Sequence, residues 1–157
     1  MTRPALGVVL WVSILSLAGF AQSERDPVIG TWELNLAKSK IIPGPAPQCE
    51  TRVYQFNGKQ LILTISAIGA DGKALTTQSA YLYDGKEYPV IGNPDIDAQT
   101  LRQIDPYNIS GTMKKSGKVV QTSSRSVSKD GKILAVAFKG VNAKGQTVDQ
   151  LLFYDRR

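Results

Sequence analysis

Residues 57–73 read NGKQLILTISAIGADGK, an apolar segment between an Asn-Gly-Lys turn and an Asp-Gly-Lys turn. Asn, Asp and Gly accept the positive φ angles of a two-residue type I′ turn, whose twist matches a pair of right-twisted strands. Between the turns, one face of an extended chain would carry Leu61, Leu63, Ile65 and Ala67. The stretch therefore predicts a β-strand that begins and ends at hairpins.

The same turn pattern recurs along the chain. Asp-Gly-Lys is repeated at 84–86 and 130–132, and residues 116–118 and 142–145 form related turns. The turns that begin at 57, 71 and 84 are 14 and 13 residues apart, and those at 116, 130 and 142 are 14 and 12 apart. No interval leaves room for a crossover helix, so a meander of antiparallel strands is expected rather than parallel βαβ units.

Ten segments between these turns are predicted to be short strands. Their predicted bounds are Ile29–Leu36, Thr51–Phe56, Gln60–Ile68, Leu75–Tyr83, Glu87–Ile91, Thr100–Ile104, Asn108–Lys114, Val119–Ser128, Ile133–Val141 and Thr147–Tyr154. Pro89 confines the fifth segment to an edge or a bulge. An open sheet of this length would expose two edges, and closure removes them. Hairpin-length connections favour an all-β, antiparallel up-and-down β-barrel over a sandwich.

The N-terminus has the pattern of a signal peptide. Arg3 precedes an apolar run at 5–17, and small residues occupy the −3 and −1 positions of a cleavage site after Ala21. The expected organisation is a signal peptide at 1–21 and one barrel domain at 22–157, which has 136 residues and a net charge of +5. This predicts a secreted or periplasmic monomer without stable membrane insertion after cleavage. An uncleaved membrane anchor is the alternative.

Composition excludes several kinds of site. The 157 residues contain no histidine and one cysteine, so a Ser-His-Asp triad, a His-ligated zinc or haem and an internal disulfide are ruled out. Asp95 and Asp97 are interpreted as turn residues rather than a calcium site, and Cys49 as a small buried side chain of a strand. We expect no enzymatic activity, no cofactor and no metal. Lysines spread singly over turns at a net charge of +6 give no reason to expect a nucleic-acid partner.

One long connection, Ala37–Gln48, carries PGPAP at 43–47. Prolines in this spacing cannot donate to a sheet ladder, so the segment is expected to cross the open end of the barrel after the first strand. A lid over a cavity and a plain covering strap are both compatible with this pattern.

Several motifs are shared with a known group of proteins. They are GTWELN at 30–35, KSK at 38–40 followed by PGPAP at 43–47, YDGKEYPV at 83–90 with GNP at 92–94, VSKDGK at 127–132 and YD at 154–155. Together they span nearly all of residues 28–155, over which the chain resembles the small secreted lipocalin-like domains of bacteria, within the calycin group. The resemblance implies an antiparallel barrel and assigns no catalytic residue.

A wider resemblance to lipocalins rests on Gly30-Thr31-Trp32. In lipocalins, the Trp of such a Gly-x-Trp packs at the closed end of the barrel against a basic side chain from a late strand. Either Arg125 or Arg156 is a candidate for that basic partner. The C-terminal helix of lipocalins is missing here, so a ligand-binding role inferred from them is an analogy of fold.

The interior of such a barrel decides the function. A ten-strand barrel can enclose a cavity, and small-ligand sites are apolar cavities with a few polar anchors. Tyr154 is part of a larger aromatic set, and Gln78, Gln121 and Gln150 could add polar groups. The candidate ligand-binding residues are Trp32, Tyr54, Phe56, Tyr81, Tyr83, Arg125, Phe138 and Phe153.

Arg125 separates two interpretations. If it faces inward, it needs an anionic partner, either a ligand carboxylate or an internal Asp. If it faces outward, the aromatic residues simply fill the core. The favoured function is an exported, non-catalytic barrel that binds a small apolar or amphipathic molecule. The alternative is a solid barrel that binds another exported protein or the cell envelope through its lysine-bearing turns or its proline-rich segment.

Overall fold

The computed structural model describes residues 26–157. The predicted signal peptide at 1–21 lies outside the described residues, so its cleavage stays a prediction. Within 26–157, no helix is long and apolar enough to cross a membrane.

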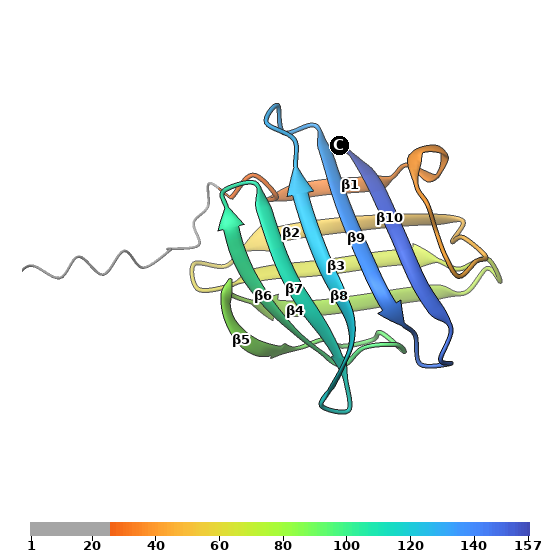
Figure 1. Ribbon diagram of the computed structural model, residues 1–157. Coiled ribbons are helices and arrows are strands. Elements are labelled where there is room, and N and C mark those ends of the chain that lie inside the picture. Colours follow the sequence, from red (N-terminus) through yellow and green to blue (C-terminus); the bar gives the residue numbers. More distant parts are fainter. Residues whose placement is uncertain (1–25) are drawn as a thin grey trace, which may run out of the picture.

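Within the described residues, ten strands form one sheet in which every pair of neighbours is antiparallel. The first strand pairs with both the second and the last, which confirms the predicted up-and-down barrel. Figure 1 shows β1–β4 behind and β6–β10 in front, with the two layers crossing. The strands are β1 Gly30–Leu34, β2 Cys49–Phe56, β3 Leu61–Ile68, β4 Ala74–Tyr81, β5 Asp84–Pro89, β6 Ala98–Asp105, β7 Asn108–Lys115, β8 Lys118–Val127, β9 Ile133–Val141 and β10 Thr147–Arg156.

Each strand is paired with its neighbour around the barrel except at one seam, between β4 and β5, where closure is incomplete. These strands stand at the two ends of the sheet order, and one isolated bridge, Gln78 to Ile91, joins β4 to the residues after β5. The Ser79 hydroxyl adds a 2.7 Å hydrogen bond to the Pro89 carbonyl. β4 and β5 form no ladder of hydrogen bonds with each other, so the hairpin expected at Asp84-Gly85 is wrong. Asp84 opens β5, and the register against β6 shifts between Asp84 and Glu87. β5 stands at one end of the sheet order, which agrees with the edge position predicted for Pro89.

The connection after β1 begins with a short 3₁₀ helix, Leu36–Lys38, which the sequence did not reveal. The chain then runs beside β10. Lys40 exchanges backbone hydrogen bonds of 2.8 and 2.9 Å with Leu151, and the Asp149 amide donates to the Ile42 carbonyl at 2.9 Å. This segment is thus tied to the barrel wall before it reaches the proline-rich stretch.

Trp32 closes one end of the barrel. Its side chain is fully buried, and its indole Nε1 donates to the Val28 carbonyl at 2.7 Å. The guanidinium carbon of Arg156 lies 4.4 Å from the centroid of the indole ring, so Arg156, not Arg125, is the basic partner of Trp32. Gly30 has a φ of 137°, and a Cβ there would stand 2.6 Å from an Arg156 nitrogen. The glycine of the Gly-x-Trp motif therefore leaves room for the arginine.

Arg156 also holds the chain entering β1. Its Nη1 donates to the Ile29 carbonyl at 2.8 Å, its Nη2 to the Pro27 carbonyl at 2.5 Å and its Nε to the Gly131 carbonyl at 2.6 Å. One side chain of the last strand thus ties the N-terminal segment to the β8–β9 turn.

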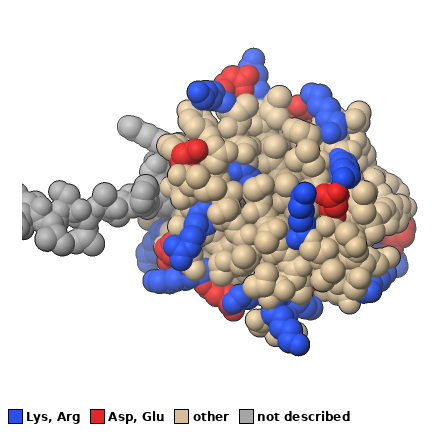
Figure 2. All heavy atoms as spheres, viewed as in Figure 1, with Lys and Arg blue, Asp and Glu red and all other residues tan. Residues whose placement is uncertain are grey.

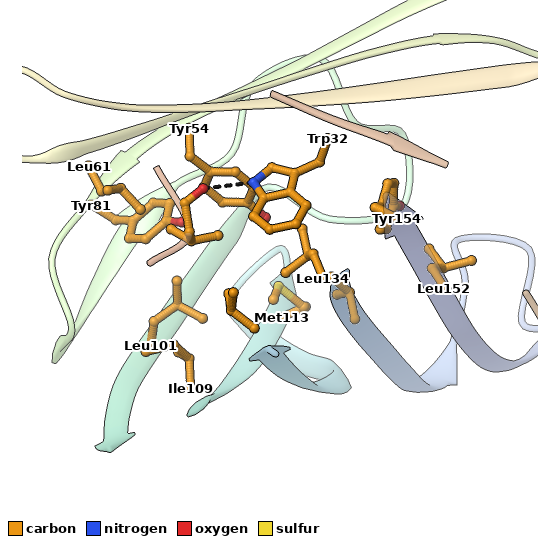
Figure 3. Packing of buried hydrophobic residues seen from close by; sticks show 13 residues of the cluster. Trp32, Tyr54, Leu61, Tyr81, Leu101, Ile109, Met113, Leu134, Leu152 and Tyr154 are labelled. Atoms are coloured by element: carbon orange, nitrogen blue, oxygen red, sulfur yellow. Dashed lines mark hydrogen bonds between the residues drawn. The ribbon is translucent and has the colours of Figure 1, made fainter. Parts of the chain in front are cut away.

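One cluster of buried hydrophobic residues forms the core, and it extends from Trp32 at the closed end into the barrel. Figure 3 shows Tyr54 and Tyr81 on one wall facing Leu101, Ile109 and Met113 on the other. These residues are at most 8% exposed.

Cys49 differs from its expected burial, because it is an exposed free thiol. Side chains alternate along a strand, and the buried residues of β2 are Arg52 and Tyr54. Cys49 lies on the opposite face of β2 from these two residues, at the first position of the strand.

Candidate cavity inside the barrel

A cavity of about 310 Å³ lies inside the barrel. Inward-facing residues of nearly every strand line it, and most of them are apolar. They include Tyr54, Leu63, Ile65, Ala67, Tyr81, Leu101, Ile109, Met113, Val136, Phe138, Val148 and Leu152, with the polar residues Glu50, Arg52, Thr77, Ser79, Gln99, Gln121, Arg125 and Gln150. A volume of this order lies at the lower end of the range of small-molecule sites.

Three connections meet at the open end of the cavity. Pro43 of the proline-rich segment, Asp95 of the β5–β6 loop and Asn142 of the β9–β10 turn all line it. The Asp95 carboxylate accepts a 3.0 Å hydrogen bond from the Ala143 amide, and Asp97 accepts one of 2.8 Å from the Ser116 amide. Both carboxylates therefore tie loops together, Asp95 at the rim of the cavity, and no metal-ligand cluster is found among residues 26–157.

Four of the eight predicted ligand-binding residues line the cavity: Tyr54, Tyr81, Arg125 and Phe138. The other four lie elsewhere among the described residues.

Trp32 packs under Arg156 at the closed end. Tyr83 does not line the cavity, but its hydroxyl accepts a hydrogen bond from Arg125, which does. Phe56 is the half-buried last residue of β2. Alternation along β10 buries Leu152 and Tyr154 and turns Phe153 to the outer face. Of the three glutamines that could add polar groups to the cavity, Gln121 and Gln150 line it, whereas Gln78 is exposed.

Arg52 is one of two buried arginines on the inner wall. Its Nε donates to Glu50 Oε1 at 2.9 Å, and the Tyr154 hydroxyl donates to the same oxygen at 2.6 Å. Its guanidinium carbon lies 4.8 Å from the centroid of the Tyr154 ring. Burial alone would lower the pKa of Arg52, but Tyr154 and Glu50 outweigh it and raise the pKa well above its ordinary value. Arg52 is therefore a charged group with a directly bonded carboxylate.

Arg125 is the second buried arginine, and it faces inward from β8. Its Nη2 donates to the Tyr83 hydroxyl at 2.6 Å, and that hydroxyl donates to Asp26 Oδ2 at 2.6 Å. The nearest Arg125–Asp26 approach is 4.0 Å, from Nη2 to Oδ1. Arg125 Nε is buried and has no hydrogen-bond partner in the part of the chain that the structure describes. The internal Asp that an inward Arg125 required is thus Asp26, linked through a tyrosine.

The rings of Tyr54 and Tyr83 flank this guanidinium, with centroids 5.4 and 5.3 Å from its central carbon. Burial alone would lower the pKa of Arg125, but Tyr83 and the other nearby groups, Asp26 among them, raise it above its ordinary value. Burial raises the pKa of Tyr83 above its usual range, with Asp26 adding to the effect. Tyr83 is therefore a protonated bridge between a cation and a carboxylate.

Two neutral polar groups complete the wall. Gln99 donates to the Ser79 hydroxyl at 2.8 Å, and Gln121 donates to the Val141 carbonyl at 3.1 Å. Both glutamine side chains are therefore fixed by the barrel itself.

Sequence reasoning missed Glu50, Arg52 and Asp26. The first two share a face of β2 with Tyr54, so a strict period of two through that aromatic residue would have placed them inside. Asp26 precedes the first strand and has no such pattern around it. Its contact with β8 depends on how the N-terminal segment crosses the closed end.

The outer surface carries most of the charge. Figure 2 shows basic and acidic side chains interspersed over the face in view. Several are paired, including Lys114 with Glu87 at 2.6 Å.

No family model and no curated protein matches this chain in sequence. Among solved structures, it is similar to zebrafish ileal bile acid-binding protein complexed with cholic acid, with a TM-score of 0.51 and 13% identity over 83% of this chain and 99% of that chain. It is also similar to lobster apocrustacyanin A1, with a TM-score of 0.45 and 17% identity over 85% of this chain and 63% of that chain. The first likeness is one of fold alone.

Proposed function

We propose that this protein is an exported, non-catalytic barrel that binds one small apolar or amphipathic molecule in its interior. The observation that carries the proposal is the cavity of about 310 Å³, lined mainly by aliphatic and aromatic side chains with a few fixed polar groups. A solid core would have favoured a binding surface for another protein instead. The zebrafish protein of similar fold is itself a bile acid-binding protein, which is consistent with this use of the barrel.

Native mass spectrometry of the protein purified from its own host provides the direct test. A native mass in excess of the denatured mass identifies a carried ligand, and the denatured mass also tests cleavage after Ala21.

A matched pair of variants then locates the binding site. Ala67 lines the cavity, whereas Ala135 of β9 lies on the face opposite the buried Leu134 and Val136. Because Ala67→Phe fills part of the cavity, it should weaken binding of the uncharged fluorophore Nile red by about tenfold or more, and Ala135→Phe should leave binding unchanged. The proposal fails if no ligand is carried and Nile red does not bind, or if both variants bind Nile red as the wild type does.

A further inference from the structure

We infer, building on the proposed function, that the cavity selects an uncharged amphipathic ligand, such as an amide, ester or alcohol, whose oxygen accepts a hydrogen bond from Arg125. The inference concerns the charge and the head group of the ligand, about which the volume of the cavity says nothing.

The charges around the cavity are balanced within the protein itself. Two cations are buried in the wall, Arg52 with a side chain 6% exposed and Arg125 with one 10% exposed. Each has one carboxylate beside it, Glu50 with a side chain 15% exposed and Asp26 with one 6% exposed. These four charges therefore cancel before any ligand enters. An anionic ligand would add a third negative charge in a region of low dielectric, and burial of an unpaired charge is costly.

The guanidinium of Arg125 is only partly hydrogen-bonded. Only its Nη2 donates a hydrogen bond among the described residues, and its Nε is buried without a partner. Arg52, in contrast, donates its Nε directly to a carboxylate. Arg125 lines the cavity and reaches its carboxylate only through Tyr83, so a ligand oxygen within reach of its guanidinium gains a charge-assisted hydrogen bond there. A neutral oxygen accepts that bond without disturbing the balance of charge.

Asp26 is an internal carboxylate held firmly near Arg125, with an Oδ1 to Nη2 distance of 4.0 Å. Its Oδ2 accepts from Tyr83 and its Oδ1 accepts from the Val28 amide at 2.9 Å. Three hydrogen bonds from Arg156 hold the same segment and the adjoining turn in place. An internal carboxylate anchored in this way competes with an external one for Arg125.

Decanamide and decanoate test the inference, because they have the same chain and nearly the same head-group shape and differ in charge at about pH 8. Displacement of Nile red measures the affinity of each. The wild type should bind decanamide about tenfold more tightly than decanoate or better. Asp26→Asn keeps the shape of the side chain and removes its charge, so it should abolish or reverse that preference. Asp130→Asn, in an exposed turn, serves as the matched control and should retain it.

Each outcome has one meaning. A wild type that binds decanoate as well as decanamide overturns the inference and leaves the binding function intact. An unchanged preference in Asp26→Asn also overturns it, because the internal charge would then have no part in selection. If Nile red binds and neither compound displaces it, the inference is overturned as well. If Nile red does not bind and no ligand is carried from the host, the proposed function itself fails.

Discussion

Arg52 and Arg125 occupy comparable positions on the inner wall, but their carboxylates are held in different ways. Glu50 lies two residues from Arg52 on the same face of β2 and bonds it directly at 2.9 Å. Asp26 comes from the segment before β1 and reaches Arg125 only through the Tyr83 hydroxyl. The first pair forms whenever β2 is extended, whereas the second requires the N-terminal segment to cross the closed end. The barrel thus contains one ion pair built into a strand and one assembled from distant parts.

Alkaline pH should disrupt both the Arg52–Glu50 and the Arg125–Asp26 groups, because each contains a buried tyrosine, and it should lower the free energy of unfolding the most. Burial raises the pKa of Tyr83 and of Tyr154 above the ordinary value, and it does the same for Tyr81. A raised pKa in the folded state means that stability is complete below about pH 10, the value of the unfolded chain, and is lost as the pH rises above it. Each of the three groups should cost about 1.4 kcal/mol per pH unit there.

Urea unfolding between about pH 8 and pH 11 measures this loss, and tyrosinate absorbance reports the ionisation itself. The loss should be less steep in Tyr154→Phe than in the wild type. Tyrosines that ionise near pH 10 while the barrel stays folded would contradict the prediction.

Removing the charge of Glu50 or of Asp26 shows how much each carboxylate contributes to stability. Glu50→Gln leaves a buried Arg52 without its directly bonded anion and should lower the free energy of unfolding by about 3 kcal/mol. Asp26→Asn should cost about 1 kcal/mol, because Arg125 makes no direct hydrogen bond to Asp26 and Tyr83 can still donate to the new side chain. Urea unfolding of the two variants beside the wild type measures the difference. An equal or larger loss in Asp26→Asn would show that the distant pair is as tightly coupled as the local one.

The same contrast explains what the sequence could and could not predict. Regularly spaced Asn-Gly and Asp-Gly turns predict the barrel because each acts on its own neighbours. Asp84-Gly85 failed as a hairpin because no local signal shows that β4 and β5 lie at opposite ends of the sheet order. Gly30-Thr31-Trp32 predicted an arginine partner, but only the pairing of β1 with β10 selects Arg156.

The candidate site was predictable to a similar degree. The inward side of β8 follows from Val127, a buried apolar residue two positions from Arg125. For β10, the sequence alone allowed either Phe153 or Tyr154 to face inward, and the structure turns Phe153 outward. The partner of Arg125 depends on a contact between the N-terminal segment and β8, and no periodicity in the sequence encodes such a contact.

Tyr154 and Tyr83 each donate a hydrogen bond to one of the two carboxylates, and removing each hydroxyl tests that bond. Tyr154→Phe removes one donor to Glu50, which keeps its bond from Arg52, so the free energy of unfolding should fall by about 1 kcal/mol. Tyr83→Phe removes the group that links Arg125 to Asp26 and leaves a further buried donor unpaired, so it should cost about 2 kcal/mol. In the double variant Tyr83→Phe with Asp26→Asn, the loss should be smaller than the sum of the single losses, because both changes act on the same Arg125–Tyr83–Asp26 connection. Additive losses would mean that Tyr83 and Asp26 stabilise the barrel independently, and Arg125 would then lack the internal carboxylate partner assigned to it.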